Sequence, residues 1–263
     1  MNYKGMTALV TGASVGLGEE FARQLAAQGA NLVLVARSHD KLARLATSLQ
    51  QQAHVEVTVL PADLSLPEEV SRLVEEVKNR KLKIDLLINN AGFGIFENFL
   101  DIPLQPQMEQ LDVNVRALVA LTHAFVPDMV ASGRGGVINM ASTAAFQPLA
   151  GANVYAASKA FVLLFSEALS LELENSGVHV LASCPGPVAT QFFAHMNPKL
   201  QAKQMDQPAT VVRDTLQAFA KGKRVAYPGK LLVRLSTWGA RLMPRNVILR
   251  VAAGTVKNLN QKP

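Results

Sequence analysis

The feature that most constrains this chain is an alternation of short apolar runs with longer helical patterns. Continuous apolar strands that alternate with helices are typical of a parallel sheet covered by helices on both faces. Right-handed crossovers then predict a doubly wound, Rossmann-type α/β fold that binds ligands at the carboxyl ends of its strands. The expected strands are Met6–Val10, Asn31–Ala36, Val55–Leu60, Ile84–Asn89, Gly136–Ala141 and Val178–Cys184. Helices are expected from near Gly16 and over about Asp40–Gln52, Pro67–Asn79, Leu104–Ala131 and Val154–Asn175.

Composition is consistent with one globular domain over residues 1–263. Apolar residues make up 49% of the chain and charged residues 17%, which favours a large core over disorder. The only cysteine is Cys184, so an internal disulfide is excluded and a reducing, cytoplasmic location is expected. The N-terminus has no apolar run typical of a signal peptide, and no run approaches the length of a membrane span. The five histidines are scattered, so we expect no metal, and no nucleic-acid motif is present.

Charge is distributed unevenly along the chain. All 20 acidic residues precede residue 215, whereas 10 of the 26 basic residues follow it, so residues 221–263 are expected to form a basic C-terminal extension. Within Lys230–Met243, apolar and basic residues form separate stripes at helical spacing. Such a helix either makes weak peripheral contact with an anionic membrane or closes the substrate cleft or a subunit contact. The apolar stripe is Leu231, Leu235, Trp238 and Leu242, the basic one is Lys230, Arg234 and Arg241, and Arg245 and Arg250 extend the charge.

A glycine-rich turn joins the first expected strand to the first helix, over Thr11–Gly18. Its glycines allow a tight turn and a close approach of the backbone to a pyrophosphate, which the helix N-terminus then binds. The spacing is G-x-x-x-G-x-G rather than the usual G-x-G-x-x-G. The expected cofactor-binding residues of this turn are Gly12, Ser14, Val15, Gly16, Leu17 and Gly18.

The second strand ends in Ala36-Arg37, at the place where an NAD-binding site would carry a carboxylate for the ribose hydroxyls. A guanidinium there is suited to a 2′-phosphate, which predicts NADP(H), although Arg37 is also compatible with a solvated loop. The third and fourth strands end in polar or glycine-containing turns, where the adenine and its ribose are expected to bind. These candidates are Asp63, Leu64, Asn90, Ala91 and Gly92, and each is by itself an ordinary turn residue.

One tyrosine has the spacing required for proton transfer. Of Tyr3, Tyr155 and Tyr227, only Tyr155 is followed four residues later by a lysine, Lys159. On a helix these two side chains share a face, and the ammonium is expected to lower the pKa of the phenol, making Tyr155 a usable acid/base.

Ser142 and Asn114 complete the expected catalytic group. Ser142 follows the fifth strand 13 residues before Tyr155, where its hydroxyl would polarise the same substrate oxygen or cap a turn. Asn114 is a poor helix former in the middle of a long helix, where it either opens the backbone and holds a water or lies on an exposed face.

These motifs together resemble the short-chain dehydrogenase/reductase family. The matching residues occur in family order over about residues 5–190, which we expect to be the cofactor-binding and catalytic core. They are Thr11–Gly18, Asp63-Leu64, Asn89–Gly92, Asn114, Ser142, Tyr155-x-x-x-Lys159 and Pro185–Thr190.

The resemblance implies a sheet of about seven strands and a Ser–Tyr–Lys–Asn tetrad. It implies that Lys159 binds the nicotinamide ribose and that Asn114 positions a water of a proton relay. Pro185, Gly186, Val188 and Thr190 would lie at the nicotinamide, with Val188 and Thr190 at its carboxamide. It also implies a homodimer or homotetramer paired through the two long helices. Many NADP-using members carry a basic residue where this chain has Ser14-Val15, so the NADP(H) preference depends mainly on Arg37, with Ser14 and Ser38.

The sequence after Pro185-Gly-Pro187 is weakly patterned, and we expect a substrate lid over residues 191–207. Aromatic residues near the expected site favour a bulky apolar carbonyl or alcohol as substrate, although they are equally compatible with a core. The predicted function is an NADP(H)-dependent oxidoreductase that transfers a hydride, and the alternative is a non-catalytic NADP-binding regulatory or membrane-associated protein. The candidate substrate residues are Phe93, Ile95, Phe96, Phe146, Phe192, Phe193 and Met196.

Overall fold

The computed structural model describes residues 3–193, 205–230, 237, 239, 244 and 246–250. Within these residues seven parallel strands form one sheet in the order β3-β2-β1-β4-β5-β6-β7. The order reverses between β1 and β4, which makes their carboxyl ends the expected ligand-binding edge. The strands are β1 (Thr7–Thr11), β2 (Asn31–Ala36), β3 (Val57–Pro61), β4 (Leu86–Asn89), β5 (Gly135–Met140), β6 (Val178–Ser183) and β7 (Val225–Ala226).

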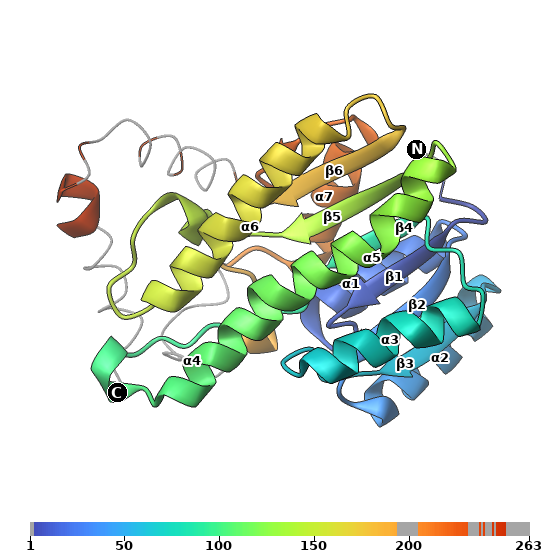
Figure 1. Ribbon diagram of the computed structural model, residues 1–263, viewed down its shortest axis with the longest axis horizontal. Coiled ribbons are helices and arrows are strands. Elements are labelled where there is room, and N and C mark those ends of the chain that lie inside the picture. Colours follow the sequence, from blue (N-terminus) through green and yellow to red (C-terminus); the bar gives the residue numbers. More distant parts are fainter. Residues whose placement is uncertain are drawn as a thin grey trace.

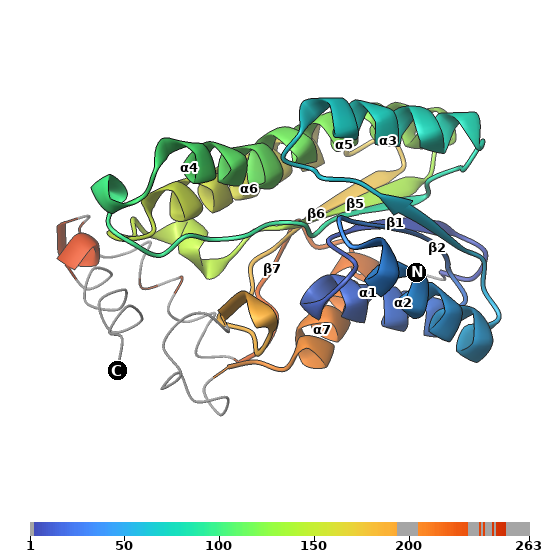
Figure 2. The same cartoon turned by 90° about the horizontal axis from the view of Figure 1, so that it is seen from below.

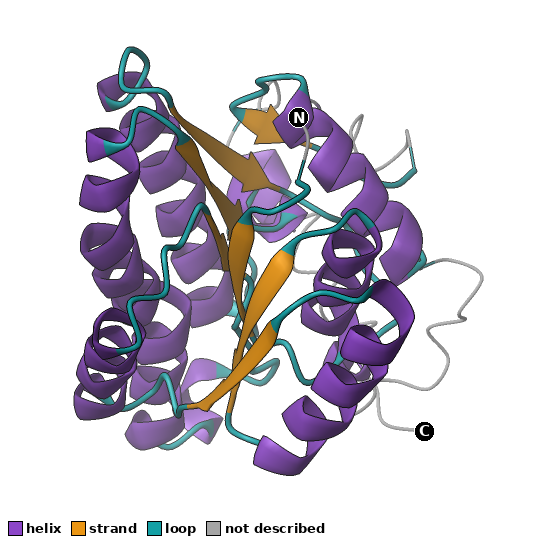
Figure 3. Ribbon diagram, turned by 90° about the vertical axis from the view of Figure 1, so that its right-hand side faces the viewer, coloured by secondary structure: helices purple, strands orange, loops and turns teal. Residues whose placement is uncertain are grey.

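Helices cover both faces of the sheet, as Figures 1 and 2 show. One layer holds α1, α2 and α7 and the other holds α3, α4, α5 and α6, with the strands between them (Figure 3). The doubly wound α/β fold predicted from the sequence is therefore confirmed. The helices are α1 (Gly16–Ala27), α2 (His39–Ala53), α3 (Pro67–Asn79), α4 (Leu104–Leu111), α5 (Ala117–Ala131), α6 (Asn153–Glu172) and α7 (Pro208–Ala220). Short segments are η1 (Phe99–Asp101), the π-helical η2 (Asp112–Arg116), η3 (Thr143–Phe146) and η4 (Gln191–Phe193).

The central strands are mostly apolar because both of their faces are buried, whereas the edge strand β3 is only partly buried. Neighbouring residues of β1 show this arrangement, since Leu9 belongs to the core on one side of the sheet and Val10 to the core on the other. Neither side chain is exposed to solvent. This explains why the sequence shows continuous apolar runs rather than the alternation of a half-exposed strand.

Most predicted boundaries are confirmed to within two residues. The ranges Asn31–Ala36 and Pro67–Asn79 are those of β2 and α3, and the helix predicted over Leu104–Ala131 is continuous through η2. The sequence analysis did not locate α7 or β7. The strand β7 has only two residues, too few for a recognisable apolar pattern, and it is defined by its pairing with β6.

Candidate active site

A cavity of about 850 Å³ lies at the carboxyl ends of the strands and joins the predicted cofactor and catalytic residues. It is lined by most of the sequence candidates, whereas Gly18 and Asn114 are buried behind its wall. The candidates in the wall are Gly12, Ser14, Val15, Gly16, Leu17, Arg37, Asp63, Leu64, Asn90, Ala91, Gly92, Phe93, Phe96, Ser142, Tyr155, Lys159, Pro185, Gly186, Val188, Thr190 and Phe192. Lining residues that the sequence analysis did not select include Lys41, Ser65, Glu109, Val113, Gln147, Leu149 and Gln191.

The glycine turn is shaped to bring backbone close to a ligand. Gly16 has a φ of +62°, which favours glycine, and it opens α1. A side chain at Gly18 would collide with the carbonyl oxygen of Gly12. No side chain caps the N-terminus of α1, so its first N–H groups face the cavity available for an anion. These features fit the pyrophosphate of a dinucleotide.

Two side chains hold the glycine turn against the end of β4. The Thr11 hydroxyl accepts hydrogen bonds from the backbone N–H groups of Asn90 (2.9 Å) and Ala91 (3.0 Å) and donates to the carbonyl of Ile88 (3.2 Å). The Asn90 amide in turn donates to the carbonyl of Thr11 at 2.9 Å. The Asn90 side chain therefore has a structural role, because it and Thr11 hold together the carboxyl ends of β1 and β4, which border the cavity.

Two basic side chains lie close to the carboxyl end of β2. Arg37 and Lys41 both line the cavity and are exposed, and Ser38 lies between them. Burial alone would raise the pKa of Asp63, but hydrogen bonds from the Ser65 N–H and hydroxyl, with the nearby charge of Arg37, hold it below its usual value. Asp63 is thus an anion beside Arg37. Lys41, in the first turn of α2, adds a second cation that the sequence analysis missed, although it lies only four residues after Arg37.

Ser142 and Tyr155 meet in the cavity from different elements. Ser142 lies in extended backbone after β5, where its Oγ accepts the N–H of Ala144 at 3.1 Å, and its side chain lies close enough to the Tyr155 phenol to lower the pKa of that group. The turn-cap interpretation of Ser142 is therefore confirmed, and its predicted role in polarising a substrate oxygen stays a prediction. The expected lowering of the Tyr155 pKa is wrong for this arrangement. Burial raises the pKa to about 12, and the nearby Ser142 side chain only partly opposes it.

The surroundings of Lys159 explain why its charge does not lower the pKa of the Tyr155 phenol below the usual value. Its ammonium donates to the carbonyl of Met140 at 2.7 Å and lies 5.9 Å from the centre of the Tyr155 ring. Burial lowers the pKa of Lys159 to about 8, against the opposing influence of Cys184. The two groups share a helix face as predicted, but both are buried, and burial disfavours the charged form of each.

Asn114 is buried, which excludes the exposed-face alternative. It lies in η2, so the helix backbone is indeed widened there. Its Nδ2 donates to the carbonyl of Phe93 and to the Ser158 hydroxyl, both at 3.0 Å, and its Oδ1 accepts the Phe93 N–H at 3.1 Å. Asn114 therefore fixes the segment after β4 against α6.

Three aromatic rings contact one another at the catalytic end of the cavity. The Tyr155 ring lies 5.4 Å from that of Phe96 and 5.7 Å from that of Phe192, and the two phenylalanine rings are 6.3 Å apart. A side chain at Gly94 would come within 2.7 Å of Phe96 and 3.0 Å of Tyr155, so glycine permits this packing. The cavity is thus apolar beside the phenol.

The remaining substrate candidates are either absent from the described lining of the cavity or lie outside the described residues. Phe146 is not among the described residues that line the cavity, since it packs against Tyr227 with ring centres 5.8 Å apart. Ile95 is likewise absent from the described lining. Phe193 lies in η4, and its side chain is outside the described part of the chain, as are Met196, most of the expected lid over 191–207 and most of the tail helix over Lys230–Met243.

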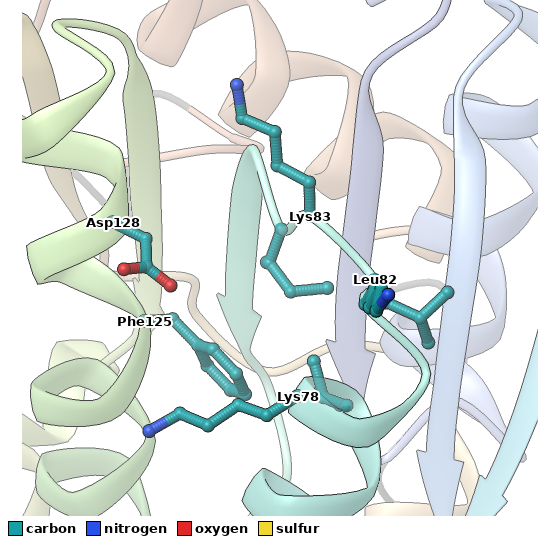
Figure 4. Close-up of a pocket in the computed structure, with 8 residues that line it drawn as sticks. Lys78, Leu82, Lys83, Phe125 and Asp128 are labelled. Atoms are coloured by element: carbon teal, nitrogen blue, oxygen red, sulfur yellow. The ribbon is translucent and has the colours of Figure 1, made fainter.

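A second hollow of about 380 Å³ lies at the opposite edge of the sheet, between the end of α3, the segment before β4 and α5. Its floor is apolar, and lysines stand at its rim. In Figure 4 the ammonium groups of Lys78 and Lys83 point away from each other, so they do not converge on one ligand. The cavity of about 850 Å³ is therefore the candidate active site.

Comparison with known proteins agrees with this geometry. The family described as short chain dehydrogenase matches residues 6–201. An uncharacterized oxidoreductase of Staphylococcus aureus is 33% identical over 83% of this chain and 92% of its own. The very-long-chain 3-oxoacyl-CoA reductase of Mus musculus is 29% identical over 98% of this chain and 82% of its own. A solved structure of a short-chain dehydrogenase from Sphingobium yanoikuyae in complex with NADPH is 31% identical, covers 98% of both chains and has a TM-score of 0.80.

Proposed function

Because the chain belongs to the short-chain dehydrogenase/reductase family of oxidoreductases, we propose that it transfers a hydride between NADP(H) and a carbonyl or alcohol, with Tyr155 as the general acid/base. The observation that carries the proposal is that Ser142, Tyr155 and Lys159 line one cavity together with the glycine turn. This assembled group favours an enzyme over a non-catalytic NADP-binding protein.

The residues that line the cavity support NADP(H) as the cofactor. The glycine turn would bind the pyrophosphate, and Arg37 with Lys41 would bind the 2′-phosphate. The relative from Sphingobium yanoikuyae, which binds NADPH, supports the phosphorylated cofactor. When bound, this cofactor supplies or accepts the hydride, and the protein supplies the proton transfer and the orientation of the substrate.

The protein groups then have separate roles in reduction. The hydroxyls of Ser142 and Tyr155 would both donate hydrogen bonds to the carbonyl oxygen of the substrate, polarising it. Since the pKa of Tyr155 is raised to about 12, the phenol is protonated at neutral pH and is ready to donate. In alcohol oxidation the phenol must first lose its proton, so oxidation should accelerate as the pH rises.

We propose an apolar, bulky carbonyl or alcohol as the substrate. Phe93, Phe96, Leu149 and Phe192 line the cavity, and burial of apolar surface contributes about 25 cal/mol per Å². The mouse relative, named for a very-long-chain acyl substrate, is consistent with this choice. An NADPH-oxidation assay should show a kcat/KM at least about tenfold higher for 2-decanone than for D-erythrose, because burying a few methylenes is worth more than 1.4 kcal/mol. The opposite order would exclude an apolar substrate.

Tyr155→Phe tests the catalytic assignment. The phenylalanine keeps the ring contacts with Phe96 and Phe192 and removes the transferred proton, so turnover should fall by at least about 100-fold. NADPH binding, measured by fluorescence, should persist. Tyr227→Phe is the matched control, because Tyr227 packs on Phe146 away from the cavity lining, and its turnover should stay near that of the parent. Near-normal turnover in Tyr155→Phe would remove Tyr155 from the mechanism.

A cytoplasmic location is part of the same proposal. It is supported by the single cysteine and by the need for reduced cofactor at the site. Fractionation of the source cells tests it, and recovery of the chain outside the cytoplasm would contradict it.

A further inference from the structure

The segment between β6 and η4, residues 185–190, lines the cavity between the glycine turn and the catalytic residues. At its start the carbonyl of Pro185 accepts the N–H of Thr143, in η3, at 3.0 Å. At its end Thr190 packs on the glycine turn, since a side chain added at Gly16 would begin 3.3 Å from Thr190 Cβ. A dinucleotide with its pyrophosphate at the glycine turn and its reacting ring at the catalytic residues would therefore run along this β6–η4 segment.

A buried aspartate is paired with the β6–η4 segment through its backbone. Asp206 and Val188 form a parallel bridge. The Asp206 N–H donates to the carbonyl of Pro187, and the Asp206 carbonyl accepts the N–H of Ala189, both at 2.9 Å. Asp206 is 5% exposed and Val188 is 4% exposed. The position of Asp206 therefore fixes the position of the residues that border the cavity at this point.

The side chain of Asp206 binds a second segment, the one that follows β7. Its two carboxylate oxygens accept the N–H of Lys230 at 3.3 and 3.4 Å. The N–H of the preceding residue, Gly229, donates to the Asp214 carboxylate of α7 at 3.2 Å. Two carboxylates thus bind two consecutive N–H groups, and hydrogen bonds to a carboxylate are roughly twice as strong as those between neutral groups. The Asp206 side chain is therefore anchored at α7 and at the end of β7.

Gly229 shows how closely these groups fit. Its φ of +91° favours glycine, and a side chain added there would collide with the Asp206 carboxylate. The carboxylate thus occupies the place that a side chain at residue 229 would take. A change at Gly229 must displace Asp206, and the backbone bridge would transmit that displacement to Val188.

We propose that Asp206 is a positioning residue that holds the β6–η4 segment against the nicotinamide half of NADP(H). This inference rests on the proposed function, which places that cofactor in the cavity. Asp206 acts through Val188 and its neighbours, because it is not among the described residues that line the cavity. The adenosine half would lie at Arg37, after β2, and β2 is separated from β6 by three strands of the sheet. Binding of that half therefore does not depend on Asp206.

Asp206→Ala tests this separation of the two halves of the cofactor. Parent and variant are titrated with NADPH and with adenosine 2′,5′-bisphosphate, which contains the 2′-phosphate but no nicotinamide. Because a hydrogen bond to a charged acceptor is lost, the variant should bind NADPH about tenfold more weakly. Its affinity for adenosine 2′,5′-bisphosphate should equal that of the parent. The kcat for 2-decanone should fall at least about tenfold, because misplacing a reacting group by about 1 Å is enough for such a loss.

Gly229→Ala tests the same contact without altering Asp206, so its result does not depend on whether Asp206→Ala folds. It should also weaken NADPH binding and spare adenosine 2′,5′-bisphosphate. Gly222→Ala is the matched control, because Gly222 has a φ of +68° and no neighbour within 4 Å of the added carbon. Its affinities for both ligands should equal those of the parent. Asp206→Asn keeps an acceptor oxygen at the same place and should restore most of the NADPH affinity lost in Asp206→Ala.

Arg37→Ala gives the reciprocal result, since it should weaken the binding of both ligands. Unchanged NADPH affinity in Asp206→Ala or Gly229→Ala overturns the proposal. An equal loss of affinity for both ligands also overturns it, because that pattern indicates general damage to the fold. A parent protein that does not bind NADPH contradicts the proposed function and this inference together. A parent that binds NADPH but reduces no carbonyl contradicts the proposed catalysis alone, and the two titrations still decide the role of Asp206.

Discussion

Lys159 is the residue whose burial has the clearest consequence for stability. Its pKa falls from 10.5 to about 8, a difference worth roughly 3 kcal/mol. Below pH 8 the lysine is charged in both the folded and the unfolded chain, and the folded chain bears the full cost of burying the charge. Between pH 8 and 10.5 the unfolded chain binds a proton that the folded chain does not, so this group makes stability rise with pH. Above pH 10.5 the lysine is neutral in both the folded and the unfolded chain, so the cost of burying a charged ammonium is absent.

Lys159→Met should therefore stabilise the protein against urea more at pH 7.5 than at pH 10.5. The variant has no buried ammonium, so the difference in unfolding free energy between variant and parent should shrink by up to about 3 kcal/mol over that range. Urea titrations of both proteins at the two pH values measure it. A difference that does not change with pH would show that Lys159 is not a buried charged group.

Arg37 should determine which cofactor the protein prefers. A charged hydrogen-bonded contact contributes about 1.5–3 kcal/mol, so the parent should bind NADPH at least about tenfold more tightly than NADH. Ala36→Asp combined with Arg37→Ala should reverse this order, because the new carboxylate accepts the ribose hydroxyls and repels a 2′-phosphate. Fluorescence titration with both nucleotides tests it.

Lys41→Ala is the companion variant, since it removes only the second cation and should weaken NADPH binding less than Arg37→Ala does. Equal affinities of the parent protein for NADPH and NADH would contradict the assignment of Arg37.

At the scale of the element, the close packing of α1 on the glycine turn decides whether the cofactor site forms. Alanine is favoured over glycine inside a helix by about 1 kcal/mol, so helix propensity alone predicts that Gly18→Ala stabilises α1. Contact with the Gly12 carbonyl predicts the opposite, because a side chain at this position displaces the turn. We expect the contact to dominate and NADPH to bind at least about tenfold more weakly, as isothermal titration calorimetry would measure.

Gly133→Ala is the control for a general loss of stability. Gly133 has a φ of +63° and no neighbour within 4 Å of the added carbon, so alanine should lower the melting temperature while leaving NADPH affinity unchanged. If Gly18→Ala bound NADPH as tightly as the parent, close packing of α1 would not define the site.

At the scale of the whole molecule, α4, α5 and α6 present an apolar outer surface. Its exposed residues are Leu104, Met108, Val130, Phe161, Leu164 and Leu171. By length and composition, the helices Leu104–Ala131 and Asn153–Glu172 also satisfy the criteria for a membrane span, with 44% of each apolar window buried in the fold. Since the same helices pack on the sheet, we propose that a second copy of the chain covers the exposed remainder.

Light scattering should accordingly give a mass of at least twice 28.3 kDa, consistent with the expected homodimer or homotetramer. Leu164 is 65% exposed, so Leu164→Glu would place a charge in the contact and should shift the protein toward the monomer. Leu66→Glu, an equal change at the start of α3, should leave the mass unchanged. A parent protein that is monomeric at working concentration would refute this assembly.

The sequence by itself determined the order of the first six strands and of the helices between them along the chain, the glycine turn and the Tyr155–Lys159 pair. These depend on periodicity and on spacings of a few residues, which the chain carries locally. Asn31–Ala36 could be predicted to the residue because its apolar run is bounded by polar residues and fully buried. The same reasoning could not separate Phe96 from Phe146, because a phenylalanine near a site has the same local pattern whether it lines a cavity or packs in a core.

Only the tertiary structure decided that Phe96 contacts Tyr155 while Phe146 contacts Tyr227, that Lys41 joins Arg37, and that the pKa of Tyr155 is raised. Each of these depends on which distant elements meet and on how much water they exclude. Desolvation is a property of the assembled surroundings, and here it outweighs the attraction of a lysine four residues away that the sequence could show.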